Sequence, residues 1–117
     1  ATKFERALVK PHNFVELWRE MPYEYFEDGQ WESGQFDRVV FTRKNDSRIV
    51  ATVYDFKTNA KRPYETDGDF RERMKQSYEP QMAAYRRPVA ALANIPLEDV
   101  GAVLLLTATS DAVDCAC

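Results

Sequence analysis

The sequence has few cysteines, few glycines and no long apolar run. Its two cysteines, Cys115 and Cys117, lie one residue apart at the end of the chain, too close for a disulfide that would staple a fold. Four glycines and an ordinary share of apolar residues exclude a fibrous or disordered chain. The longest apolar run, around residues 103–106, has the length of a strand, whereas a membrane helix needs about 18 residues. With no signal peptide visible, we expect a cytoplasmic protein without a membrane segment.

Positive charge is not in excess, and histidine is almost absent. The formal net charge is −3, so no overall basic field would draw nucleic acid to the surface. A DNA enzyme stays possible, because a site that collects carboxylates around a metal is acidic and a local Lys/Arg cluster is enough to meet phosphates. The single histidine, His12, has no Cys, His or Asp nearby at ligand spacing, so we interpret it as a surface or cap residue.

The length of 117 residues fits one domain with a single modest core. The chain begins without an initiator methionine, which indicates a domain excised from a larger protein. We therefore treat residues 1–117 as one domain.

Hydrophobic spacing and turn residues predict three strands in the first half of the chain. Residues 1–19 carry two short helical patterns separated by a proline. A strand over residues 20–27 follows, and Asp28-Gly29 is a strong hairpin-turn signal. A second strand, a polar turn and a third strand over residues 48–57 complete an antiparallel meander.

The second half of the chain predicts helices and one buried strand. Thr66, with Asp69 three residues later, resembles a capping box that opens a helix to about residue 76. Pro80 is placed as the first residue of a further helix, which Pro88 should kink or interrupt. The nearly continuous apolar run over residues 100–109 is typical of a strand buried on both faces.

Strand alternation places carboxylates in rows that are otherwise apolar. In the second strand Asp37 shares a face with Val39 and Phe41, and the opposite face is predicted to hold the other alternate residues, Phe36, Arg38 and Val40. Asp55 and Lys57 emerge side by side at the end of an apolar row of the third strand. Because burying a charge is costly, an aspartate in an apolar row requires a special reason. Gly34 marks either a bulge or a point where another group approaches the backbone closely.

These residues fit the needs of phosphodiester hydrolysis, which requires an activated water, positive charge at the non-bridging oxygens and help for the leaving alkoxide. Asp37 and Asp55 on adjacent strands can hold Mg²⁺ or Mn²⁺, with the Phe56 backbone carbonyl, waters and the scissile phosphate at the remaining positions. Lys57 projects on the same side as Asp55, close enough to orient the water or stabilise developing negative charge. Residues 31–58 are therefore interpreted as the active-site hairpin of a metal-dependent nuclease.

Three motifs occur in order, Gly34-x-x-Asp37, then Asp55-Phe56-Lys57-Thr58, then Gln81-x-x-x-Tyr85. Together they resemble the motif series of the PD-(D/E)XK nuclease superfamily, and more closely that of the nuclease domains at the C-terminus of bacterial RecB- and AddA-type helicase–nucleases. The resemblance implies an α/β, restriction-endonuclease-like fold, whose central mixed sheet, here the antiparallel meander plus the buried later strand, is flanked by helices. It also implies that Asp37 and Asp55 bind the metal, that Lys57 is catalytic, and that Gln81 and Tyr85 line the site.

The function implied by this resemblance is cleavage of DNA during the processing of double-strand ends, in repair and recombination. It favours exonuclease over endonuclease action, and it implies helicase domains of the same parent chain, with or without a partner subunit, as neighbours.

Two departures from the family pattern matter. Related nucleases carry an active-site histidine on a helix well before the first strand, and His12 lies too near that strand to be equated with it. We expect that helix to be missing from this chain. A branch of the superfamily binds an iron–sulfur cluster through one early and three late cysteines; without an early cysteine, Cys115 and Cys117 do not support a cluster, and we expect none.

Two other interpretations stay open. A nuclease-like domain that no longer cleaves could serve DNA binding or subunit docking, although a silent domain has no need to keep Asp37, Asp55 and Lys57 together. Alternatively, the motifs are accidental in a structural α/β domain, which predicts no metal site. The basic residues that follow the site either form a solvated helix face or lie along a DNA path; they are Lys61, Arg62, Arg71, Arg73, Lys75, Arg86 and Arg87.

Overall fold

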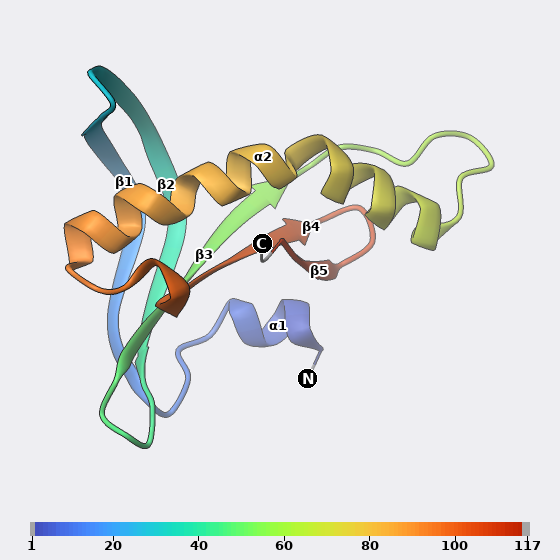
Figure 1. The fold of residues 1–117 in the computed structure, drawn as a ribbon. Coiled ribbons are helices and arrows are strands. Elements are labelled where there is room, and N and C mark those ends of the chain that lie inside the picture. The colour runs from blue at the N-terminus through green and yellow to red at the C-terminus, as the bar shows by residue number, and fades with distance from the viewer. Residues whose placement is uncertain (1, 116–117) are drawn as a thin grey trace.

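The computed structural model describes residues 2–115 and contains a mixed five-stranded sheet between a long and a short helix (Figure 1). The strands lie side by side in chain order, namely β1 (Phe14–Glu27), β2 (Gln30–Arg43), β3 (Ile49–Lys57), β4 (Val100–Leu106) and β5 (Asp111–Asp114). β3 and β4 run parallel, and the other neighbouring pairs are antiparallel. The helices α1 (Lys3–Ala7) and α2 (Asp67–Ala93) cover opposite faces, and a short 3₁₀ turn, η1 (Leu97–Asp99), leads into β4. The α/β fold predicted from the motifs is confirmed.

The β1–β2 hairpin is long, and its closed end projects beyond the rest of the sheet (Figure 1). Asp28 (φ 53°) and Gly29 (φ 74°) form its turn, and both have the positive φ that a two-residue type I′ turn requires. Glu27 pairs with Gln30 directly across this turn. The hairpin predicted from Asp28-Gly29 is therefore confirmed.

The start of β1 corrects the prediction of a second helix within residues 14–19. Only the first helical pattern forms a helix, α1, which Thr2 caps by accepting a hydrogen bond from the backbone of Glu5. From Phe14 onward the chain pairs with β2, and the Trp18 ring lies 4.7 Å from that of Phe41. The backbone pairing and the ring contacts that β2 offers outweigh a helical spacing too short to form a stable helix.

The helix α2 is one continuous element of 27 residues, where the sequence predicted two. Thr66 caps it as expected, with its hydroxyl accepting from the Asp69 backbone N–H, and Asn94 ends it in the left-handed conformation. Pro80 and Pro88 both lie inside the helix. Burial along the whole length against the sheet offsets the backbone hydrogen bonds that these prolines remove. Among residues 2–115, no helix has the apolar length needed to cross a bilayer.

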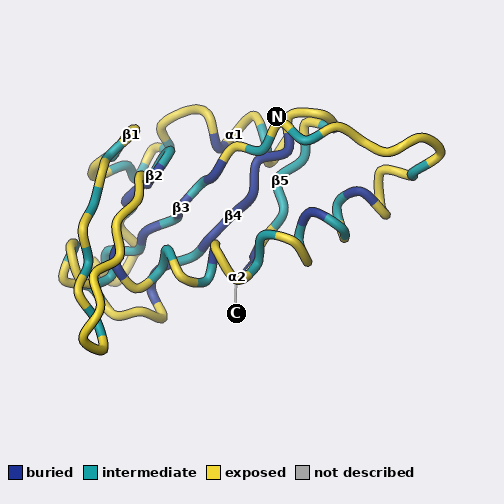
Figure 2. The backbone as a smooth tube through the Cα atoms, turned by 90° about the horizontal axis from the view of Figure 1, so that it is seen from above, coloured by how far each residue is buried: buried dark blue, intermediate teal, exposed yellow. Residues whose placement is uncertain are grey.

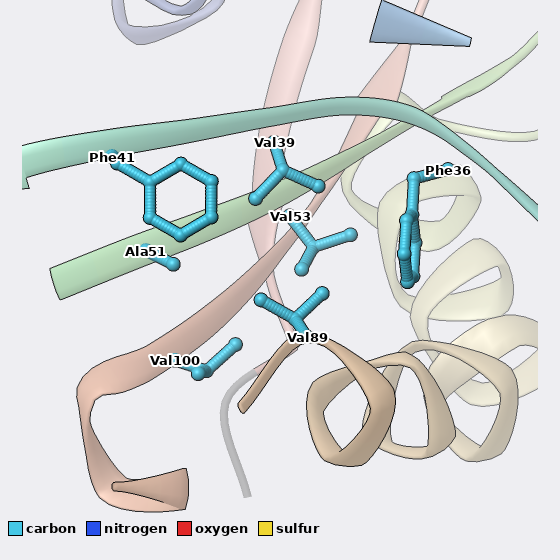
Figure 3. Close-up of a cluster of buried hydrophobic side chains, with 7 residues drawn as sticks. All are labelled: Phe36, Val39, Phe41, Ala51, Val53, Val89 and Val100. Atoms are coloured by element: carbon cyan, nitrogen blue, oxygen red, sulfur yellow. The ribbon is translucent and has the colours of Figure 1, made fainter. Parts of the chain in front are cut away.

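The main core lies between α2 and the sheet, and β4 is the strand most completely buried in it (Figure 2). One cluster joins β2, β3, β4 and α2; its members are Phe36, Val39, Phe41, Ala51, Val53, Val89 and Val100 (Figure 3). Every residue of β4 except Gly101 is buried, which confirms the prediction for the apolar run. A smaller cluster under α1 fills the other face, where Ala7 meets Val103 and Leu105.

Phe36 corrects the predicted strand faces. Alternation assigned it to the face opposite Val39 and Phe41, yet it is fully buried in the same cluster as these two residues. Its ring stacks on Tyr23 at 4.3 Å between centroids. The partner strand is distorted here, because Glu20 has a φ of 47° and interrupts the sequence of paired residues opposite β2. Regular alternation of faces therefore does not continue past Asp37.

Candidate functional site

The site begins where β2 and β3 separate. The two strands pair from Arg43 and Ile49 as far as Arg38 and Tyr54, and no pairing follows. The next residue on β2 is Asp37, whose Oδ2 accepts a hydrogen bond of 2.9 Å from the Phe56 backbone N–H. A carboxylate side chain thus occupies the place of a backbone carbonyl of β2. We call this place, formed by Asp37, Asp55 and the Phe56 backbone, the strand fork.

Asp55 is the buried carboxylate of the strand fork, with 5 % of its surface exposed. Its Oδ2 lies 2.8 Å from the Lys57 ammonium, and among residues 2–115 it accepts no hydrogen bond of good geometry. Burial raises the pKa of Asp55 to about 6; Lys57 opposes this rise, and the neighbouring carboxyl of Asp37 adds to it. Two carboxyls with one ammonium between β3 and α2 therefore leave unbalanced negative charge at the fork.

Lys57 connects the fork to α2. Its Nζ donates to Gln81 Oε1 at 3.3 Å, and Gln81 Nε2 in turn donates to the Tyr85 hydroxyl at 3.0 Å. Burial, followed by the charge of Asp55, raises the pKa of Tyr85 to about 12, so this hydroxyl stays protonated. The structure thus brings all five side chains singled out from the sequence into one site, namely Asp37, Asp55, Lys57, Gln81 and Tyr85.

Sequence reasoning missed Tyr78. The Lys57 ammonium lies 4.2 Å from the centre of the Tyr78 ring, in cation–π geometry, and the Tyr78 hydroxyl accepts a hydrogen bond from Asn59. Tyr78 precedes Gln81 by three residues on the same helix and so shares its face. In the sequence, this three-residue spacing from Gln81 is the signal that indicates a place for Tyr78 in the site.

Tyr23 was also missed, and it explains Gly34. The Tyr23 ring lies across the backbone of Gly34, its cross-strand partner, so closely that an added Cβ would come within 2.8 Å of the Tyr23 hydroxyl oxygen. Of the two expectations for Gly34, the close approach of another group is the correct one. This approach places the Tyr23 ring against Phe36 and, edge-on, against Tyr85. The glycine of the first motif thus shapes the wall behind the strand fork.

Gly34→Ala is expected to destabilise the protein by about 1–3 kcal/mol, because the new methyl group must displace the Tyr23 ring. In a Tyr23→Ala background the same change should be neutral or stabilise by about 0.4–1 kcal/mol, since alanine restricts the unfolded chain more than glycine does. Urea unfolding of the parent, both single variants and the double variant measures this difference. An equal cost in both backgrounds would refute the contact as the reason for the glycine.

The donors at the strand fork suit a hard divalent cation, such as Mg²⁺, that keeps several waters. Residues 2–115 contain no group of three or more His, Cys, Asp and Glu side chains able to share a metal. Mg²⁺ is commonly held by one or two carboxylates together with waters and substrate phosphates, which a larger protein cage would exclude. The buried Oδ2 of Asp55, which forms an ion pair with Lys57 but no hydrogen bond of good geometry, lies beside the Asp37 carboxyl and matches this open kind of site.

Other candidate residues lie away from the fork. His12 is exposed in the turn before β1, where the neighbouring Asn13 carbonyl accepts from the Arg43 backbone at the far end of β2. Cys115 is buried, and Cys117 lies outside the described residues. Arg86 donates to the backbone carbonyls of Val100 and Leu97, so its guanidinium fixes α2 to the start of β4.

Comparison with known sequences supports the interpretation of this chain as a nuclease-like domain. A search of curated proteins finds no significant match. The family profile of the PD-(D/E)XK nuclease superfamily matches residues 2–113, nearly the whole chain. Nucleases of this superfamily generally use divalent metal ions such as Mg²⁺. With the motif residues gathered at one fork of a mixed α/β sheet and the profile covering that sheet from α1 to β5, the chain belongs to the PD-(D/E)XK nuclease superfamily.

Proposed function

We propose that this chain is a Mg²⁺- or Mn²⁺-dependent deoxyribonuclease domain, acting as an exonuclease rather than an endonuclease. In this proposal it is the nuclease domain of an ATP-dependent helicase–nuclease that processes DNA ends in repair and recombination in the cytoplasm. Its neighbours would be the helicase domains of the same parent chain and a partner subunit. The three motifs that resemble RecB- and AddA-type nuclease domains support this context.

The observation that carries the nuclease function is the chain of contacts from the fork to α2. Asp37 and Asp55 lie on two separating strands, and Lys57 links Asp55 to Gln81 and Tyr85. The backbone carbonyl oxygen of Phe56 adds a further possible metal ligand. Because the N–H and C=O of one residue in an extended strand point to the same side, the Phe56 carbonyl is expected to face Asp37, as its N–H does.

In the proposed reaction, Asp37, Asp55 and the Phe56 carbonyl would hold the cation, and the cation would supply positive charge near the scissile phosphate and the attacking water. Lys57 orients that water and stabilises negative charge that develops on the phosphate oxygens. Gln81 and Tyr78 fix the Lys57 ammonium in place, since both contact it directly. The protonated Tyr85 hydroxyl keeps the Gln81 amide oriented toward the lysine.

Calorimetric titration with Mn²⁺, combined with an assay of single-stranded DNA degradation, tests the proposal. We expect the wild-type chain to bind Mn²⁺ and to cleave, and Asp37→Ala to lose cleavage and to bind Mn²⁺ at least about tenfold more weakly. Glu16→Ala removes an exposed carboxylate from β1 and serves as the matched control.

Each outcome assigns the chain to one function. Mn²⁺ binding without cleavage by the wild type would favour the silent nuclease-like domain that binds DNA or docks a subunit. If neither the wild type nor the variants bind Mn²⁺, the metal-site interpretation fails and the fork is structural.

A further inference from the structure

Two arginines face each other across β1 and β2 next to the strand fork. Arg19 and Arg38 are direct partners in the antiparallel register, so their side chains lie on the same face of the sheet. They line one open hollow of about 290 Å³, together with Glu20, Asp37 and Phe56. The hollow thus adjoins two residues of the proposed metal site.

Within the part of the chain that the structure describes, Arg19 and Arg38 form no ion pair that would offset the repulsion between their charges. Directly opposed like charges in a sheet destabilise it, and a buried guanidinium nitrogen without a hydrogen bond adds a further cost. Nε of Arg38 is buried and unsatisfied, and neither arginine forms an ion pair within 4.0 Å among residues 2–115. Glu20 borders the hollow but pairs with neither of them. An anion bound between the two side chains would offset both of these costs.

Three arginines on α2 show a different arrangement, in which the guanidinium group binds partners within the fold. Arg73 forms a two-point pair with Glu65, Arg71 pairs with Asp111, and Arg86 binds backbone carbonyls. These contacts occupy their guanidinium groups with partners within the fold. Arg19 and Arg38 line the hollow beside the fork without such an ion-pair partner among residues 2–115.

We propose that Arg19 and Arg38 bind a backbone phosphate of the DNA strand that neighbours the phosphate to be cleaved at the fork. Guanidinium groups recognise phosphate oxygens through two parallel hydrogen bonds, which a single exposed lysine does not provide. Phe56, which is partly exposed in the same hollow, offers an apolar surface for the adjoining sugar or base. This inference rests on the proposed nuclease function, and it assigns the strand a path from the fork into the hollow beside Arg19 and Arg38.

Binding of single-stranded oligothymidylate in EDTA tests the subsite without cleavage. Arg38→Gln is expected to weaken binding about 10-fold and to reduce the slope of log K against log salt by about 0.7, the value for one lost contact to single-stranded DNA. Arg38→Lys keeps the charge but not the guanidinium, so it should recover the slope and only part of the affinity. Arg43→Gln is the matched control, because it removes the same charge from an exposed position at the other end of β2.

The outcomes separate this inference from the proposed function. Equal losses for Arg38→Gln and Arg43→Gln would reduce the effect to net charge and overturn the subsite. An unchanged salt slope in Arg38→Gln, with an unchanged urea unfolding midpoint to show that the variant folds, would overturn it as well. Mn²⁺ binding and DNA cleavage by the wild type decide the nuclease function independently, since neither measurement involves the arginine variants.

Discussion

Replacing Lys57 by methionine is expected to slow DNA cleavage by about a hundred- to a thousandfold while the chain still binds Mn²⁺. The ammonium lies 2.8 Å from Asp55 and 3.3 Å from Gln81, so its position is set from both β3 and α2. Methionine keeps the unbranched side chain and can still pack on the Tyr78 ring, but it carries no charge to stabilise the reacting phosphate.

The measurement is the initial rate of degradation of a labelled single-stranded oligonucleotide, with Mn²⁺ affinity determined in parallel. Lys57 lowers the pKa of Asp55, so its loss raises that pKa further, and both experiments are best run near pH 8. Lys44→Met, at an exposed position in the turn after β2, is the control. A variant that cleaves normally would remove Lys57 from the reaction, whereas loss of Mn²⁺ binding at pH 8 would assign it to the metal site alone.

Asp55→Asn is expected to reduce both Mn²⁺ affinity and cleavage by at least about a hundredfold, because it removes a carboxylate ligand outright and not merely a group that orients one. The change keeps the shape of the side chain and an oxygen that can accept from Lys57. A retained Mn²⁺ affinity in a folded Asp55→Asn variant would contradict the role of Asp55 as a ligand.

The same variant should alter how the metal-free fold responds to pH. The folded pKa of Asp55, about 6, lies above its ordinary value of 3.8, so between about pH 4 and 7 the folded state binds more protons than the unfolded state. The free energy of unfolding of the wild type should therefore rise as the pH falls through 6, and Asp55→Asn should lack this rise. Denaturation in urea at several pH values, with EDTA present, measures the free energy of unfolding of the wild type and of Asp55→Asn.

At lower pH another residue reverses the trend. Hydrogen bonds from Arg73 lower the pKa of Glu65 to about 2, so the stability from this pair is present above about pH 4.5 and is lost as the pH falls toward 2. These two groups together therefore favour the folded state most near about pH 4.5, where the two ranges meet. A wild-type curve that falls steadily from pH 7 to 5 would contradict the raised pKa of Asp55.

Much of the grouping of the candidate residues follows from simple geometry along each strand or helix, whereas the resemblance of the motifs predicted that β3 and α2 bring them together. Asp55 and Lys57 follow alternation along β3, and Gln81 and Tyr85 follow the helical repeat, so each pair shares a face whatever the rest of the chain does. The order of the motifs then predicted which elements meet. The turn at Asp28-Gly29 could also be predicted from local sequence, since it depends on positive φ at two adjacent residues.

The errors arose where a distant contact determines the local structure. Residues 14–19 have a helical spacing, but β2 supplies a pairing strand that local sequence does not reveal. Phe36 departs from alternation because Glu20, on the other strand, distorts the hairpin. Tyr23 reaches the site because its ring lies over the backbone of Gly34 on the partner strand. A motif within one strand does not reveal such a contact between two strands.

The contact of Tyr23 with Gly34 also bears on how related chains should differ from one another. The motif glycine is required here by the volume of a particular ring on the partner strand, and its φ is not positive. A relative with a small residue in place of the tyrosine has no such requirement and is free to carry a side chain in place of the glycine. These two positions should therefore vary together among homologues, whereas the carboxylates and the lysine of the fork should not vary with either.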